Sequence, residues 1–168
     1  MDEIYFAGGC FWGTQHFLKQ INGVLSTQVG YANGNVHNPT YEQVYTDATG
    51  YAETVRVVYD QTQLSLKQLI ELYFCSIDPT LVNRQGEDVG TRYRTGIYFC
   101  NDGQLPIIKD VYAAVAKRYD VPIAVELQKL QNFYPAEDYH QNYLDKNPNG
   151  YCHIPHELMA MARKANIK

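Results

Sequence analysis

Apolar residues recur along the chain in two periods. Short apolar runs bounded by glycine, asparagine or proline, some alternating with polar residues, are typical of strands with one or both faces buried. They predict strands over residues 4–7, 24–31, 54–59, 95–100 and 125–130. Apolar residues spaced three and four apart predict helices over residues 10–21, 66–77 and 105–119.

The stretches between these elements are rich in turn-forming residues. Residues 35–50 have no clean period, and residues 83–91 are polar and contain glycine, so both are predicted to be loops. Pro135 is predicted to open a short helix that runs through Leu144, because proline favours the first position of a helix. A turn-rich tail follows over residues 147–155, and a last helix is predicted over residues 156–164.

The first six predicted elements follow one another as strand, helix, strand, strand, helix and strand. This order predicts an α+β fold, a mixed sheet with helices packed on it around a ferredoxin-like, split βαβ core. Long irregular loops and an extended C-terminal tail complete the expected architecture. The 168 residues fit a single domain over 1–168, since no repeat or linker divides them.

Composition and charge exclude several classes of protein. Apolar residues make up 45% of the chain, which argues against intrinsic disorder. A net charge of −4 argues against binding to nucleic acid, because proteins that bind a phosphate backbone carry a basic excess. We find no secretory signal and no apolar run near the ~20 residues that span a bilayer. We therefore expect a cytoplasmic protein, in a reducing compartment, with no membrane partner.

The four cysteines, at positions 10, 75, 100 and 152, are the scarce reactive groups. No pair has the C-x-x-C spacing of a zinc ribbon or a thioredoxin-type dithiol. Cys75 and Cys100 lie in apolar segments and are predicted to be inert core residues. His153 and His156 lie close together without an evident third ligand, so no metal site is expected.

Cys10 and Cys152 have the more reactive positions. Cys10 follows two glycines where a predicted strand meets a predicted helix, and the positive end of a helix dipole lowers the pKa of a thiol. The alternative is that this cysteine only packs a tight turn. Phe11 and Trp12 add an apolar wall suited to a methyl-bearing substrate. Cys152 lies in the turn-rich tail, where it is either a mobile resolving thiol or an ordinary surface cysteine.

Three other residues have side chains able to transfer or donate a proton. Glu53 opens a strand among apolar and aromatic neighbours, where desolvation raises the pKa of a carboxyl and lets it act as an acid. The alternative is an ordinary glutamate of an edge strand. Tyr41 and Tyr93 lie in polar stretches punctuated by glycine or proline, outside the apolar stripes of the predicted helices.

The run Gly9-Cys10-Phe11-Trp12-Gly13 resembles the signature of the A-type peptide methionine sulfoxide reductases, the S-epimer-specific class. The resemblance spans residues 5–153 in family order. Its further blocks are Val29-Gly30-Tyr31-Ala32, Asn38-Pro39-Thr40-Tyr41, Thr49-Gly50-Tyr51-Ala52-Glu53, Asp78-Pro79-Thr80, residues 84–94, Ala136-Glu137-Asp138-Tyr139-His140-Gln141 and Gly150-Tyr151-Cys152.

The resemblance implies a mixed α/β enzyme with a ferredoxin-like centre. Such an enzyme reduces methionine-S-sulfoxide, peptide-bound or free, and so repairs oxidised proteins under oxidative stress. It needs no bound cofactor, acts as a monomer in our expectation, and passes through a cysteine sulfenic acid and an intramolecular disulfide that thioredoxin reduces.

The resemblance also implies roles for individual residues. Cys10 is the implied nucleophile, Cys152 the resolving cysteine and Glu53 the acid. The implied cage for the substrate methyl group is formed by Phe11 and Trp12. The implied hydroxyl donors to the sulfoxide oxygen are Tyr41 and Tyr93. Asp88 is the implied aspartate that helps to hold the site. The chain departs from the family at Tyr51, usually histidine, and at Arg92, often glutamine.

Two other functions remain open on the sequence alone. A different thiol-dependent peroxidase would also use Cys10 and Cys152, but it would need no methyl cage. A non-catalytic, ferredoxin-like module would bind a small ligand through its tyrosine-rich loops. Comparing the turnover of hydrogen peroxide with that of a methionine sulfoxide peptide distinguishes a peroxidase from a methionine sulfoxide reductase. Loss of function in Cys10→Ser excludes the non-catalytic module.

Overall fold

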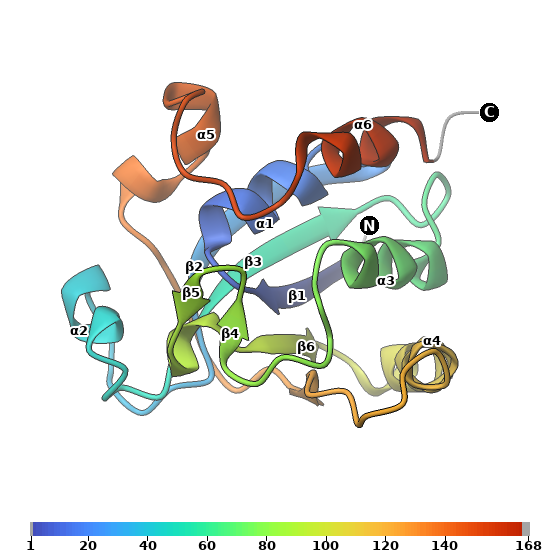
Figure 1. The fold of residues 1–168 in the computed structure, drawn as a ribbon, viewed down its shortest axis with the longest axis horizontal. Coiled ribbons are helices and arrows are strands. Elements are labelled where there is room, and N and C mark those ends of the chain that lie inside the picture. Colours follow the sequence, from blue (N-terminus) through green and yellow to red (C-terminus); the bar gives the residue numbers. More distant parts are fainter. Residues whose placement is uncertain (1, 166–168) are drawn as a thin grey trace.

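The computed structural model describes residues 2–165, which form an α+β fold with helices packed on a six-stranded mixed sheet (Figure 1). The sheet strands are β1 (Asp2–Gly8), β2 (Val24–Ala32), β3 (Ala52–Tyr59), β6 (Thr95–Phe99), β7 (Glu126–Lys129) and β8 (Phe133–Pro135). A separate hairpin pairs β4 (Arg84–Gln85) with β5 (Asp88–Val89). None of the described helices is long and apolar enough to cross a lipid bilayer.

The described helices are mostly short. They are α1 (Phe11–Leu18), α2 (Tyr41–Tyr45), α3 (Leu66–Cys75), α4 (Leu105–Ala116), α5 (Tyr143–Lys146) and α6 (His156–Lys164), with single 3₁₀ turns η1 (Thr91–Tyr93), η2 (Asp102–Gln104) and η3 (Asp138–His140). The strands and long helices predicted from the apolar periods are present within a few residues of their predicted bounds.

The strands lie in the order β7-β6-β1-β3-β2-β8. Neighbouring strands pair antiparallel except β6 and β7, which are parallel, so the sheet is mixed. Helix α1 packs on the central strands, while α5 and α6 pack against α1, and α3 packs against α4 (Figure 1). Because only two residues separate the end of β1 from the start of α1, the N-terminus of α1 lies at the end of the central strand β1 and the beginning of the central strand β3.

The two faces of the sheet are both apolar but unequal. In β1, Ile4 and Phe6 belong to the main core, whereas Tyr5 and Ala7 belong to a smaller cluster that includes Tyr98. Side chains of a strand alternate between its faces, so the main core lies on one face and the smaller cluster on the other. Burial on both faces explains why the sequence shows apolar runs here rather than clean alternation.

Three predictions for the connecting segments were wrong. Residues 35–50 contain α2, which begins with a capping box between Thr40 and Gln43. Residues 83–91 contain the β4–β5 hairpin. Pro135 ends strand β8 instead of opening a helix; β8 is an edge strand, where a residue without an N–H group is tolerated.

Candidate active site

Cys10 stands directly before α1 as its N-cap residue, as the sequence predicts. Gly9, with a φ of +87°, makes the left-handed turn that leads from β1 into the helix. The Cys10 carbonyl accepts a hydrogen bond from the backbone N–H of Thr14 at 3.3 Å. The thiol is thereby held at the N-terminus of α1, and Cys10 is 7% exposed.

Glu53 lies in β3 beneath the first turn of α1. Its Oε1 atom accepts a hydrogen bond from the backbone N–H of Phe11 at 3.1 Å, and the residue is 1% exposed. Burial raises the pKa of Glu53 to about 8, although the Phe11 N–H group and the Arg92 guanidinium lower it. This is the direction that the sequence predicts, and it leaves the carboxyl protonated at neutral pH.

The prediction of a lowered pKa for the Cys10 thiol was wrong. Burial raises its pKa well above the usual range, and the Glu53 carboxyl raises it further. The backbone N–H groups of Trp12 and Gly13 lower the pKa, as expected at a helix N-terminus, but their effect is smaller than that of desolvation. Cys10 is therefore a thiol at rest, beside a protonated carboxyl.

Tyr41 and Tyr93 lie close enough to Cys10 and Glu53 for ionisation of either group to raise the pKa of the phenols. Burial raises the pKa of both phenols, and Glu53 and Cys10 raise the pKa of each further. Both phenols therefore keep their protons at neutral pH and can donate hydrogen bonds. Tyr41 begins α2 and Tyr93 ends η1, so these two short elements bring both phenols near Cys10 and Glu53.

Arg92 lies against Tyr93 and Tyr45, with its guanidinium carbon 4.3 and 4.2 Å from their ring centroids. It forms an ion pair with Asp47 at 2.6 Å. Arg92 thus joins α2 to η1, the segments that carry Tyr41 and Tyr93. At the other departure from the family pattern, the buried Tyr51 hydroxyl donates to the carbonyl of Val36.

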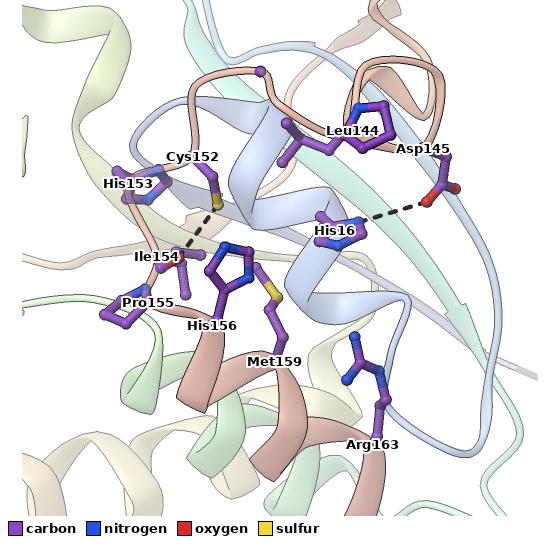
Figure 2. A pocket seen from close by; sticks show the side chains of 12 residues that line it. His16, Leu144, Asp145, Cys152, His153, Ile154, Pro155, His156, Met159 and Arg163 are labelled. Atoms are coloured by element: carbon purple, nitrogen blue, oxygen red, sulfur yellow. Dashed lines mark hydrogen bonds and ion pairs between the residues drawn. The ribbon is translucent and has the colours of Figure 1, made fainter.

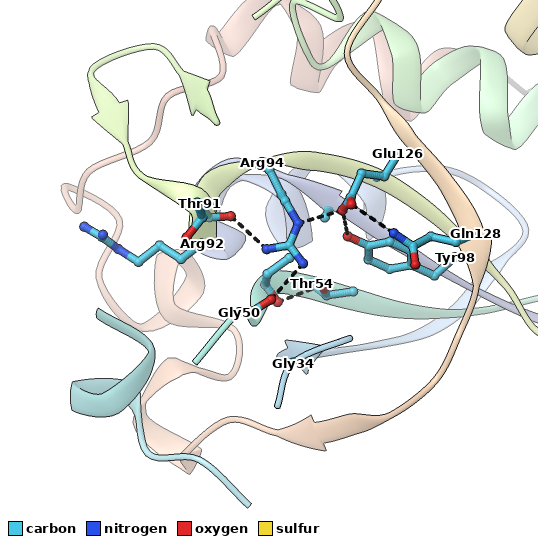
Figure 3. A network of polar contacts seen from close by, with 12 residues as sticks. Gly34, Gly50, Thr54, Thr91, Arg92, Arg94, Tyr98, Glu126 and Gln128 are labelled. Carbon is cyan, nitrogen blue, oxygen red and sulfur yellow. Dashed lines mark hydrogen bonds and ion pairs between the residues drawn. The ribbon is translucent and has the colours of Figure 1, made fainter. Parts of the chain in front are cut away.

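A polar network centred on Arg94 fixes η1 relative to the sheet (Figure 3). The Arg94 guanidinium donates to Glu126 Oε1 at 2.6 Å, to the Thr91 carbonyl at 3.0 Å and to the Gly50 carbonyl at 2.8 Å. Tyr98 also donates to Glu126, at 2.8 Å. The network ties η1 to β7 and to the turn before β3, and so holds the segments that carry Tyr93 and Glu53.

Phe11 and Trp12 extend from the first turn of α1 into an aromatic cluster. Phe11 is 1% exposed and lies beside the rings of Tyr31 and His140. Trp12 stacks on Tyr143 with ring centroids 3.7 Å apart and donates from Nε1 to His140 Nδ1 at 3.0 Å. The indole plane is thus fixed from two sides.

His140 and Glu137 also contact the residues of this site, although neither was predicted from the sequence as a site residue. Glu137 accepts hydrogen bonds from the Tyr31 hydroxyl at 2.8 Å and from the Tyr41 backbone N–H at 3.1 Å. Both residues lie within the block of residues 136–141 that carries part of the family resemblance, which was the available signal. Nothing in their own spacing indicates contact with residues more than 90 positions away.

Asp88 lies in β5 and holds the tail of residues 147–155, which connects α5 to α6. Its Oδ2 atom accepts a hydrogen bond from the Tyr151 hydroxyl at 3.1 Å. Burial raises the pKa of Asp88. The carboxylate charge of Asp88 in turn raises the pKa of Cys10 and of Glu53. Asp88 therefore binds Tyr151, the neighbour of Cys152, and also influences the protonation of Cys10 and Glu53.

Cys152 lies against the N-terminal half of α1 (Figure 2). A Cβ atom placed on Gly13 would be 3.2 Å from the Cys152 sulfur, so only glycine lets the tail approach so closely. Gly13 is three residues after Cys10, which is about one helical turn. The structure thus brings Cys152 near Cys10 although 142 positions separate them, and all four cysteines are free thiols.

Cys152 also borders a cavity of about 670 Å³ between α1, the tail and α6 (Figure 2). Charged and titratable side chains line it together with apolar ones; they include His16, Asp145, His156 and Arg163. Among residues 2–165, no group of three or more histidine, cysteine or acidic side chains is arranged to hold a metal ion.

The prediction that Cys75 is a core residue was wrong, because Cys75 is exposed at the end of α3. It lies four residues after Glu71, which is also exposed, and so falls on the solvent face of that helix. Cys100 is half-buried. Neither residue adjoins the group formed by Cys10, Glu53 and the two tyrosines.

The site thus combines a thiol, a protonated carboxyl and two phenols at one helix N-terminus. These are the groups that a thiol-dependent oxidoreductase needs. The family model described as peptide methionine sulfoxide reductase matches residues 2–168. The peptide methionine sulfoxide reductase MsrA of Clostridium acetobutylicum is 57% identical over 159 residues, 95% of this chain and 98% of that protein. MsrA of Mycoplasma genitalium is 52% identical over 154 residues, 92% of this chain and 98% of that protein.

Solved structures show the same fold. Reduced Mxr1 from Saccharomyces cerevisiae matches with a TM-score of 0.86 and 36% identity, over 90% of this chain and 88% of that one. Methionine sulfoxide reductase A of Corynebacterium diphtheriae matches with a TM-score of 0.81 and 35% identity, over 92% and 82%. Mxr1 in complex with Trx2 matches with a TM-score of 0.60 and 24% identity, over 84% and 83%, a likeness of fold alone.

The chain belongs to the A-type peptide methionine sulfoxide reductases. It is an oxidoreductase that reduces methionine sulfoxide to methionine.

Proposed function

We propose that the enzyme reduces the S epimer of methionine sulfoxide, peptide-bound or free, with Cys10 as nucleophile and Glu53 as acid. The observation that carries this proposal is the hydrogen bond from the Phe11 N–H to Glu53, which holds a protonated carboxyl beside the Cys10 thiol. The sulfoxide oxygen leaves only when it is protonated or hydrogen-bonded, and the carboxyl supplies that proton.

In the reductive step the Cys10 sulfur attacks the sulfoxide sulfur while Glu53 gives its proton to the oxygen. Tyr41 and Tyr93 donate hydrogen bonds to that oxygen and stabilise its developing charge. The bond between the sulfoxide sulfur and its protonated oxygen breaks, and the released hydroxide bonds to the Cys10 sulfur as the bond between the two sulfur atoms breaks. Methionine leaves, and Cys10 carries the oxygen as a sulfenic acid. The proton of the Cys10 thiol restores the Glu53 carboxyl. Cys10 loses two electrons, and the sulfoxide gains them.

In the recycling step Cys152 condenses with the sulfenic acid, water leaves, and thioredoxin reduces the resulting disulfide. The approach of Cys152 to Gly13 supports this pairing. The solved complex of Mxr1 with Trx2 supports the choice of reductant. We propose that the enzyme acts as a monomer without a bound cofactor.

Phe11 and Trp12 form the cage for the substrate methyl group in this proposal. Trp12 keeps part of its surface exposed, and its plane is set by Tyr143 and His140. We expect Trp12→Ala to lower kcat/KM by about 10- to 200-fold, the range for losing small apolar contacts, with most of the change in KM. Steady-state kinetics with a methionine sulfoxide peptide checks this, and an unchanged KM contradicts the cage.

Cys152→Ser separates the two steps. We expect the variant to release one equivalent of methionine per enzyme and then stop, with Cys10 sulfenic acid accumulating, because no second thiol closes the disulfide. A burst assay with thioredoxin as reductant, followed by sulfenic-acid trapping, measures both quantities. Multiple turnovers at the wild-type rate would contradict the resolving role of Cys152.

We also propose that residues 1–168 are one domain whose centre is a ferredoxin-like, split βαβ unit. The elements β1, α1, β2, β3, α3 and β6 support it through their order along the chain. The strand order β6-β1-β3-β2 and the antiparallel pairing of these strands support it as well. The long loops and the C-terminal tail over 147–155 would then be additions that carry Tyr41, Tyr93 and Cys152.

A further inference from the structure

His153, next to Cys152 in the tail, is held in one orientation over the N-terminal turn of α1. Its Nε2 atom lies 2.8 Å from the carbonyl oxygen of Gly8. Because a carbonyl only accepts hydrogen bonds, Nε2 carries a proton and donates it to this bond. In the neutral ring, Nδ1 is then the nitrogen with a free lone pair.

The Nδ1 atom of His153 is buried and has no hydrogen-bond partner in the described part of the chain. A buried polar atom without a partner is costly, and such atoms often mark a functional role. Burial lowers the pKa of His153, although the Gly8 carbonyl and Asp88 raise it. The ring is therefore neutral at pH 7, and Nδ1 is able to accept a proton.

The Cys152 thiol lies near His153 Nδ1. A Cβ atom placed on Gly13 would lie 2.9 Å from His153 Nδ1 and 3.2 Å from the Cys152 sulfur, so these two atoms are no further apart than the sum of those distances. Figure 2 shows the two side chains next to each other on the same side of α1. Both therefore face the helix turn that begins at Cys10.

Cys152 needs such a base. Burial raises the pKa of its thiol, and its sulfur donates to the carbonyl of Ile154 at 3.4 Å. The thiolate, not the thiol, is the attacking form of cysteine, so a protonated Cys152 attacks slowly at neutral pH. No step of the reductive half of the reaction uses His153, which leaves its free nitrogen to be explained by the recycling half.

We propose that His153 Nδ1 is the general base that removes the proton of the Cys152 thiol as Cys152 attacks the Cys10 sulfenic acid. The Cys152 sulfur forms a bond to the Cys10 sulfur, the bond from Cys10 sulfur to oxygen breaks, and the leaving oxygen takes the proton from His153 to become water. Cys152 is oxidised and the sulfenic sulfur is reduced. This inference rests on the proposed Cys10–Cys152 disulfide.

The surroundings of the ring set its basicity. Strand β1 supplies the Gly8 carbonyl, α1 supplies Gly13, and β4 supplies the neutral side chain of Gln85 near Gly9. The charged group that acts on the ring is Asp88 in β5, and the Cys152 thiol is the titratable group beside it. A proton taken up at Nδ1 is thus stabilised by the Gly8 carbonyl and the Asp88 carboxylate.

Single-turnover kinetics of His153→Gln tests the proposal. Glutamine keeps an N–H donor that can reach the Gly8 carbonyl but has no basic nitrogen. The reduced enzyme is mixed with one equivalent of a methionine sulfoxide peptide and quenched at intervals. Released methionine is then quantified, and mass spectrometry separates the sulfenic acid from the disulfide. The matched control is His156→Gln, which changes an exposed histidine lining the same cavity.

We expect disulfide formation in His153→Gln to slow by about 10²-fold or more at pH 7, as for loss of a general base, with one equivalent of methionine still released. The rate should then rise about tenfold per pH unit as the thiol ionises unaided, whereas the wild-type and His156→Gln rates stay nearly flat above pH 7. His153→Asn, which also lacks a basic nitrogen, should behave like His153→Gln.

Three outcomes would overturn the assignment: a wild-type rate and pH profile in His153→Gln, an equal slowing in His156→Gln, or methionine release slowed as much as disulfide formation. Thermal unfolding of each variant identifies a loss of folding, in which case His153→Asn carries the same test. If wild-type enzyme releases methionine but forms no Cys10–Cys152 disulfide, the proposed recycling step is wrong. That result differs from failure of the His153 assignment, in which wild-type enzyme still forms the disulfide.

Discussion

Glu53→Gln lowers kcat/KM for methionine sulfoxide by about 10²- to 10⁴-fold in the expected result, because glutamine cannot protonate the leaving oxygen. The amide oxygen can still accept the hydrogen bond from the Phe11 N–H, so the first turn of α1 keeps its support. Steady-state kinetics with a peptide substrate measures the loss. A decrease of less than about threefold would contradict the role of Glu53 as the acid.

The pH dependence of methionine release also tests the role of the Glu53 carboxyl. With the pKa of Glu53 at about 8, the carboxyl is protonated below pH 8 and ionised above it. We expect wild-type methionine release in a single turnover to fall as the pH rises through about 8, since the acid form is lost. The residual activity of Glu53→Gln should show no such fall.

The same substitution should stabilise the fold. The pKa of Glu53 is about 8 in the folded protein and near the ordinary glutamate value of 4.5 when the chain is unfolded. A folded-state pKa that is raised means that the folded protein binds the extra proton, so stability is lost as the pH rises from about 4.5 to 8. At pH 7 the loss is about 3 kcal/mol, which Glu53→Gln avoids. Urea unfolding at pH 5 and pH 8 measures it, and no difference between wild type and variant at pH 8 would contradict the burial of an acid here.

Cys10→Ser should abolish methionine sulfoxide reduction, with a loss on the order of 10⁶-fold, as for removal of an enzyme nucleophile. A serine hydroxyl in the same buried place stays protonated and attacks sulfur poorly. The matched control is Cys75→Ser, at the exposed end of α3, which should keep wild-type activity. Activity of Cys10→Ser within tenfold of wild type would exclude covalent catalysis by this residue.

The positions along the chain of the longer strands and helices could largely be predicted from the sequence. Runs such as residues 24–31 and the stripe from Leu66 to Phe74 have clear periods, and each becomes an element at nearly the predicted place. Helix α2 and the β4–β5 hairpin could not be predicted, because elements of five and two residues are too short to show a period. The capping box stabilises α2, and the tight turn between the two strands stabilises the β4–β5 hairpin.

The sequence predicted the direction of the pKa shift of Glu53 but not that of Cys10. Position before a helix made Cys10 a candidate, yet the pKa of its thiol depends on how much surface the fold covers and on how near Glu53 comes. Neither quantity is present in the local sequence. The same applies to Cys152, whose contact with α1 follows from the path of the tail between Asp88 and Gly13.

Mass spectrometry of the enzyme after one turnover shows whether the substrate oxidises Cys10 and whether Cys152 then joins it in a disulfide. Reduced enzyme is treated with one equivalent of a methionine-S-sulfoxide peptide, its free thiols are alkylated, and the digested protein is analysed without reduction. We expect a disulfide that joins the peptides of Cys10 and Cys152 in wild-type enzyme, and an oxygen atom on Cys10 in Cys152→Ser. Methionine release with Cys10 still reduced and alkylated in both proteins would contradict the proposed mechanism.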